Sequence, residues 1–313
     1  MRKFVLLSVA IFLAFVGCNK EENQKDAVMV ILKGESSDYW SQVGTAIEAE
    51  CRAEGVEAVI RYTANDADYR SQLDAMEEME KLKYNFKGIV AVPIYSEGNH
   101  QVEAKIAEAA AGRNIPVIII DTPVDEGTSP LAGKYRAYVG TDNGNAGKIL
   151  AGHVAADKEN ILSVRSKASN ASLLRYNGFS SVKGKTEIWE TTEAEAVGID
   201  KQLANHPSVT DIVYFNGSLP AYSSVLEYLG NNGKTVYTFD VFEITLYALM
   251  NGAVVKGILA QNTFEMGRQA VDAVFNTSAK NPIYIEPIYI TKDNLTSEKV
   301  KPFIDYYFAD INK

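Results

Sequence analysis

Residues 115–121 read Ile-Pro-Val-Ile-Ile-Ile-Asp, and this stretch decides the fold. It is a continuous apolar run without polar alternation, bounded by Asn114 and by Thr122-Pro123. Such a run predicts a central strand of a parallel sheet, because helices cover both faces of such a strand. A strand buried on both faces has little room for a carboxylate, so we expect Asp121 at its carboxyl end, where open α/β sheets bind ligands. Asp also caps turns, and this residue alone leaves both interpretations open.

The chain on either side of this stretch, from Val28 onward, alternates short β-rich runs with longer helical patterns. That alternation predicts parallel sheets built from βαβ units, and 313 residues suit about two domains. Asp142 and Asn143 interrupt the pattern, so we expect the chain to cross into a second, similar α/β unit there. Later in the chain, one helix is expected over residues 194–205, a strand over 284–290 and a helix over 298–308.

Polar side chains follow several of the predicted strands. Ser37 comes a short loop after the first strand, and the others directly follow a strand: Asp121, Asn216, Asp240 and Gln261. Side chains at equivalent strand ends converge on one site, although each of them taken singly could be a turn residue. Gln261 weakens that alternative, because no turn signal accompanies it.

The N-terminus has the pattern of an export signal, predicted over residues 1–17. Arg2 and Lys3 precede an apolar run, 4–16, that is shorter than the about 20 residues needed to span a bilayer. The run ends in Phe15-Val16-Gly17-Cys18, which resembles the lipobox of bacterial lipoproteins, with Phe15 where Leu is usual. Lipidation is therefore predicted at Cys18, with residues 18–26 as a polar tether. An ordinary cleavable signal with a stray cysteine is the alternative.

Several function classes lack support. The net charge of −9, without a basic block, argues against nucleic-acid binding. The three histidines share no ligand spacing, so neither a metal nor a cofactor is expected. Cys51 lies on an apolar helical stripe with Trp40, which indicates a core position. No complete phosphate-binding loop, dinucleotide fingerprint or nucleophile elbow is present, so there is no positive signal for an enzyme.

The order of these features over residues 27 to about 289 resembles the type I periplasmic binding proteins, and most closely the ribose/galactose-type sugar-binding proteins of ABC transporters. The resemblance implies an α/β fold of two doubly wound, Rossmann-like parallel-sheet lobes joined by a multi-strand hinge. The N-terminal lobe would contain residues 27–140 and about 262–289. The C-terminal lobe would contain residues 141–261 and about 290–313.

The resemblance also implies a ligand site. An aromatic pair that stacks on the sugar falls on Tyr39-Trp40, although Trp40 also fits the apolar stripe of its helix. An arginine ligand falls on Arg175, in Arg175-Tyr176-Asn177-Gly178-Phe179. The polar ligands of the family fall on Asp121, Asn216, Asp240 and Gln261, and its first hinge crossing on Asp142 and Asn143. Two positions depart from the family: Ser37-Asp38 precedes the aromatic pair where the family has Asn, and Thr122 stands where the family has Arg.

The implied protein is an exported, membrane-anchored lipoprotein of the periplasm or cell surface. It would act as a monomer that captures a small sugar, polyol or nucleoside, closes about its hinge and delivers the ligand to an ABC permease. A lipoprotein that presents the sugar to a receptor or sensor kinase would have the same fold and site. A cytoplasmic repressor would need a helix-turn-helix N-terminus in place of the export signal, and a hydrolase is the remaining alternative.

Overall fold

The apolar stretch before Asp121 forms strand β4 (Val117–Ile120), whose side chains are all buried. Ile119 packs with the helices on one face of the sheet, and Ile118 and Ile120 pack with those on the other. The strand is therefore covered on both faces, as the sequence predicts. The computed structural model describes residues 24–35, 37–94, 100–154, 160–167, 169–252 and 254–309, so the predicted export signal and Cys18 lie outside the described residues.

The first lobe is built on a six-stranded parallel sheet with helices on both faces. Its strands, in spatial order, are β11 (Ile283–Tyr284), β5 (Ala137–Gly140), β4, β3 (Tyr84–Ala91), β1 (Lys25–Ile31) and β2 (Glu57–Arg61). Its helices are α1 (Asp38–Ala53) and α10 (Thr263–Phe275) on one face, and α2 (Tyr69–Lys81) and α3 (Gln101–Arg113) on the other.

The second lobe repeats this plan, and only its edge strand β12 runs antiparallel. Its strands, in spatial order, are β12 (Ile288–Ile290), β10 (Val255–Ala260), β9 (Thr235–Phe239), β8 (Asp211–Tyr214), β6 (Ile161–Ser166) and β7 (Glu187–Thr191). Its helices are α4 (Asn143–His153), α5 (Asn170–Lys183), α6 (Glu193–Ala196), α7 (Ile199–Asn205), α8 (Ser223–Asn231), α9 (Glu243–Met250) and α11 (Lys301–Phe308). Lys292–Asn294 form a 3-10 turn.

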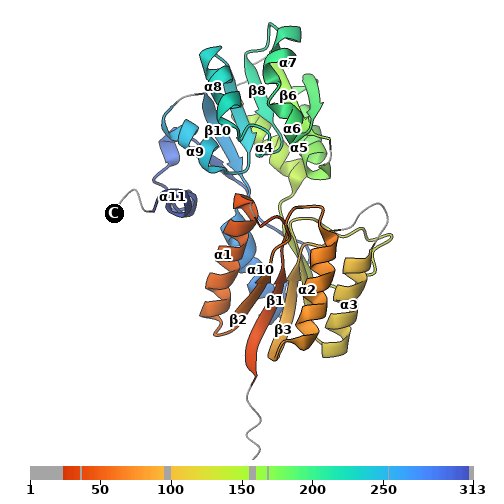
Figure 1. Cartoon of the computed structure of the whole chain (residues 1–313). Helices are drawn as coiled ribbons and strands as arrows, with labels where there is room; N and C mark the ends of the chain where they lie inside the picture. The colour runs from red at the N-terminus through yellow and green to blue at the C-terminus, as the bar shows by residue number, and fades with distance from the viewer. Residues whose placement is uncertain are drawn as a thin grey trace, which may run out of the picture.

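The chain passes between the lobes after β5, after β10, and between β11 and β12. Figure 1 shows the two lobes stacked end to end, with these connections between them. The predicted fold, two doubly wound parallel-sheet lobes, is confirmed. Because parallel strands place their carboxyl ends at one edge of each sheet, the residues after β4 and after β9 lie at this junction.

Some local predictions are wrong. Residues 194–205 form two helices, because the chain turns at Gly198 between α6 and α7. Residues 284–290 form parts of two strands in different sheets, separated by a crossing that contains Pro287, which cannot donate a backbone hydrogen bond. The last helix begins at Lys301, after the 3-10 turn, rather than at residue 298.

Among the described residues, no helix is both long and apolar enough to cross a membrane. Cys51 is buried in the first lobe, as its place on the apolar stripe predicts.

Candidate functional site

Asp121 is the centre of a polar cluster in the first lobe. It directly follows β4 with a φ of 59°, a left-handed conformation that Asp adopts more readily than most residues. The Tyr39 hydroxyl, from the first turn of α1, donates to Asp121 Oδ1 at 2.7 Å, and the Thr122 hydroxyl donates to Oδ2 at 2.8 Å. The Tyr138 hydroxyl donates to the Asp121 carbonyl at 2.7 Å. The carboxylate is thus fixed through both oxygens, yet each oxygen keeps a lone pair for a further donor.

Lys33 extends this cluster. Its Nζ lies 3.4 Å from Thr122 Oγ1 and 5.9 Å from the centre of the Trp40 ring. Lys33 is not among the predicted site residues, although it lies two residues after the end of β1, where polar side chains of a parallel sheet converge.

Burial and hydrogen bonding differ among Tyr39, Trp40 and Ser37. Trp40 is only 4% exposed and packs in the core of the first lobe, whereas Tyr39 is half-buried and bonded to Asp121. Burial, and then the nearby Asp121 charge, hold the pKa of Tyr39 well above its ordinary value, so its hydroxyl stays a neutral donor. Ser37 lies at the start of α1 and makes no side-chain capping bond.

Asp240 is the counterpart of Asp121 in the second lobe. It follows β9, which has the same place in its sheet as β4, and it has a φ of 56°. Gln261 Nε2 donates to Asp240 Oδ1 at 2.8 Å. Arg175 Nη1 and the backbone N–H of Gly217 donate to Oδ2 at 3.3 and 3.4 Å. The predicted residues Arg175, Asp240 and Gln261 therefore form one network.

Arg175 is 4% exposed and is held along one side of its guanidinium. Nε donates to Asn143 Oδ1 at 2.7 Å, and Nη1 also donates to the Phe215 carbonyl at 3.2 Å. The guanidinium lies 4.5 Å from the centre of the Phe239 ring, a distance typical of a cation–π contact. Nη2 has no hydrogen-bond partner among the described residues. The sequence indicated Asn143 only as a hinge residue, and it did not indicate the role of Phe239.

Asn216 and Asp142 are oriented by local turns. The backbone N–H and hydroxyl of Ser218 donate to Asn216 Oδ1 at 3.0 and 2.7 Å, so the side-chain NH₂ of Asn216 is left for other acceptors. Asp142 caps α4 by accepting from the N–H of Asn145 at 2.9 Å. It therefore fixes the start of the helix that carries Asn143.

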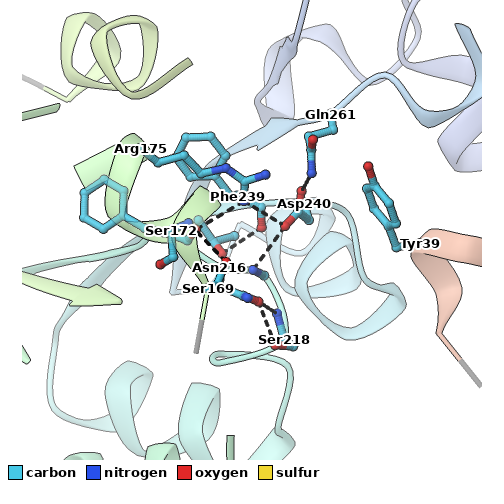
Figure 2. Close-up of polar contacts among 12 residues, drawn as sticks. Tyr39, Ser169, Ser172, Arg175, Asn216, Ser218, Phe239, Asp240 and Gln261 are labelled. Atoms are coloured by element: carbon cyan, nitrogen blue, oxygen red, sulfur yellow. Dashed lines mark hydrogen bonds and ion pairs between the residues drawn. The ribbon is translucent and has the colours of Figure 1, made fainter. Parts of the chain in front are cut away.

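The two clusters face each other across the junction of the lobes. Figure 2 shows Tyr39 on one side and Asp240, Gln261, Arg175 and Asn216 on the other. No hydrogen bond joins the Asp121 cluster to the Asp240 network among the described residues. Carboxylate acceptors together with arginine and amide donors suit a ligand whose groups both donate and accept hydrogen bonds. Within the described part of the chain, no group of side chains is arranged to hold a metal ion.

Comparisons with known proteins identify relatives of this chain. Residues 28–281 match the family model described as the periplasmic binding protein domain. The chain is 25% identical over 222 residues to the D-allose-binding periplasmic protein of Escherichia coli (strain K12), which covers 66% of this chain and 68% of that protein.

Two solved structures share the fold. The sugar-binding protein of a sugar ABC transporter from Bacillus halodurans has a TM-score of 0.71 at 19% identity, covering 86% of this chain and 98% of that one. An ABC transporter solute-binding protein from Agrobacterium vitis, bound to α-D-tagatopyranose, has a TM-score of 0.71 at 20% identity, covering 89% and 99%.

Proposed function

The chain belongs to the periplasmic binding protein domain family, and from this premise we propose that it binds a small sugar between its two lobes. The ligand is a monosaccharide, or a polyol or nucleoside of similar size. The role is capture and delivery rather than catalysis, since the polar groups described above are arranged to bind hydroxyl groups.

The observation that carries this proposal is the pair of anchored carboxylates, one in each lobe. Asp121 and Asp240 are each oriented by protein donors and keep lone pairs free. Arg175 Nη2 and the Asn216 amide remain as donors. A sugar hydroxyl both donates and accepts, so one ring of hydroxyl groups can use both kinds of partner, while the Tyr39 ring offers an apolar face for its C–H groups.

The Kd expected from these contacts is low enough for the protein to capture its ligand. Each hydrogen bond to a charged partner contributes about 1.5–3 kcal/mol net. A few such bonds, after the cost of association, give a Kd in the micromolar range or below, since a Kd of 1 μM corresponds to about −8.2 kcal/mol.

A thermal-shift screen followed by titration calorimetry tests the proposal. D-Allose is the first probe, because it is the sugar named for the relative in Escherichia coli, and pentoses, other hexoses, polyols and nucleosides complete the panel. A probe at about 100 times its Kd stabilises the folded protein by about 2.7 kcal/mol. If no member of the panel raises the melting temperature or releases binding heat, the ligand class is wrong.

The delivery step and the anchor are part of the same proposal. The signal-like N-terminus and Cys18 support a lipid-anchored protein outside the cytoplasm. The family supports delivery of the sugar to an ABC permease, and we propose that the protein does this as a monomer. Deleting the gene should abolish high-affinity uptake of the radiolabelled sugar. Cys18→Ser should leave the protein unanchored or unprocessed and abolish metabolic labelling with a fatty acid, and equal labelling of the unmodified protein and the variant would remove the anchor from the proposal.

A further inference from the structure

Helix α11 belongs to one lobe but contacts the other. Phe303 and Phe308 pack in the core of the second lobe, together with residues of α8 and α9. Tyr306 and Tyr307, on the same helix, contact the first lobe. Figure 1 shows α11, in dark blue, at the level of the junction and beside the N-terminal end of α1.

The contact is centred on the Tyr307 hydroxyl. This hydroxyl donates to the Val241 carbonyl of the second lobe at 2.9 Å and accepts from Gln42 Nε2 of the first lobe at 2.8 Å. The Thr263 hydroxyl donates to Gln42 Oε1 at 2.8 Å. Gln42 and Thr263 are each 1% exposed, so these bonds are shielded from water. A shielded bond between two lobes resists their relative movement more than an exposed one.

Neighbouring groups support the same contact. The hydroxyl of Tyr306 interacts with the Ser41 side chain, and the Asp38 carboxylate lies beside Tyr307. Burial, and then the Asp38 charge, raise the pKa of Tyr307 above its ordinary value. Asp38, Ser41 and Gln42 all belong to the first turns of α1, so one end of that helix meets α11.

The residues that α11 meets through Tyr307 lie next to the candidate site in sequence. Val241 directly follows Asp240, and Gln42 lies three residues after Tyr39, on the same helix. Thr263 lies two residues after Gln261, at the crossing between β10 and α10. The Tyr307 hydroxyl bonds to both Gln42 and Val241. It therefore also holds the Tyr39 side of the site in position relative to the Asp240 side.

We propose that Tyr307 is a positioning residue, which acts with Gln42 to hold the ligand groups of the two lobes in one relative position. We call this bond between Tyr307 and Gln42 the latch. The latch is a connection between the lobes in addition to the crossings of the main chain. Without it the free protein samples more relative orientations of the lobes, and fewer of them are competent to bind, so the apparent affinity falls. The effect on affinity rests on the function proposed above, whereas the effect on lobe geometry does not.

Tyr307→Phe and Gln42→Met test the latch in the full chain. Both variants keep most of the side-chain volume and remove the bond between the lobes. Tyr307→Phe also removes the bond to the Val241 carbonyl, and Gln42→Met also removes the bond from the Thr263 hydroxyl. We expect each of them to raise the Kd for D-allose by roughly three- to tenfold, the loss associated with about one hydrogen bond. The double variant should lose clearly less binding free energy than the sum of the two single losses, because both changes break the same bond between the lobes. Tyr247→Phe, the same change at a tyrosine that is 61% exposed on α9, should leave the Kd unchanged.

A sugar-free measurement separates the latch from the choice of ligand. Dyes attached to bioorthogonal side chains at the exposed positions Glu77 and Lys201 report the distance between the lobes by energy transfer. The distribution of transfer efficiencies should broaden in Tyr307→Phe and in Gln42→Met, and should not change in Tyr247→Phe. A fold that was merely weakened would lower the melting temperature without this broadening.

The outcomes are distinguishable. Unchanged transfer efficiencies in both variants would overturn the latch, as would additive losses in the double variant or tighter binding of D-allose. If the unmodified protein fails to bind D-allose while Tyr307→Phe still broadens the distance distribution, the latch stands and the choice of sugar fails.

Discussion

The nitrogen atoms of the Arg175 guanidinium have different roles in the site. Nε and Nη1 are committed to Asn143, to the Phe215 carbonyl and to Asp240, which leaves Nη2 for a ligand. The Phe239 ring beneath the planar group fixes its orientation further. A lysine has neither the planar fork nor the second donor along its edge, so it could not replace these contacts.

Arg175→Ala should therefore weaken both binding and folding. Loss of the donor and of the charge beside Asp240 should cost about 2–4 kcal/mol of D-allose binding, or a factor of roughly 30 to 1000 in Kd. Because Arg175 and Asp240 are both buried, we also expect a loss of about 1–3 kcal/mol in unfolding free energy. Titration calorimetry and chemical denaturation measure the two effects.

A matched control for this variant is Arg268→Ala. Arg268 forms an exposed ion pair with Glu265 on α10, and such surface pairs contribute only about 0.2–1 kcal/mol. The control should bind D-allose normally. If Arg175→Ala changes the Kd by less than about threefold, a shift of under about 0.7 kcal/mol, Arg175 does not contact the ligand.

At this scale the sequence predicts where polar side chains lie, but not how they are held. An apolar run followed by a polar residue is enough to place Asp121, Asp240 and Gln261 at a sheet edge. The bond from Tyr39 to Asp121 joins residues 82 positions apart, and no local pattern indicates it. The left-handed backbone at Asp121 and Asp240 is likewise a product of the turn that each lobe makes there.

Among the elements, α4 and α5 set the position of Arg175, and they do so through glycine. A Cβ added at Gly147 of α4 would lie 1.9 Å from the Arg175 carbonyl oxygen. A Cβ added at Gly178 of α5 would lie 1.9 Å from the Gly144 carbonyl oxygen. The two helices therefore approach backbone to backbone, which places Asn143 on α4 within reach of Arg175 on α5.

Gly178→Ala should push these helices apart. Overpacking of this kind costs typically about 1–3 kcal/mol of stability, and the shift of α5 should also weaken D-allose binding, because Arg175 moves relative to Asp240. Gly152→Ala is the control: it lies on α4 with no atom within 4 Å of its added Cβ, and it should stabilise the protein by about 0.5–1 kcal/mol. Equal behaviour of the two variants in thermal unfolding and calorimetry would contradict this account of the helix pair.

Element type was largely predictable from the sequence, whereas the ends of elements and their partners were not. The apolar run at residues 115–121 is sufficient for β4, since its length and composition suit a buried strand. Residues 284–290 are also rich in β-forming residues, yet the chain there leaves one sheet for the other between Tyr284 and Ile288. That crossing depends on the relative position of two sheets, which is long-range information absent from a short window.

Across the whole molecule, the division of the site between two lobes determines how a ligand would act. The Asp121 cluster lies in the first lobe and the Arg175 and Asp240 network in the second, while α11 and the chain crossings connect the lobes. Because the site is divided, the binding energy is divided between the lobes as well. A ligand that contacts one lobe gains part of its binding energy, and the remainder is available only when the other lobe reaches the same ligand.

D-Allose should therefore make the protein more compact. When Asp121 holds a sugar, Asp240 and Arg175 of the second lobe can bond to it only if the lobes approach one another. Binding therefore shifts the population towards closed lobes. Small-angle scattering of the full chain should show a smaller radius of gyration at D-allose concentrations that calorimetry has shown to be saturating. A sugar of the panel that gives no thermal shift should leave the radius unchanged. A constant radius with saturating D-allose would place the ligand within one lobe, and the affinities of Asp121→Asn and Asp240→Asn would then identify which lobe holds it.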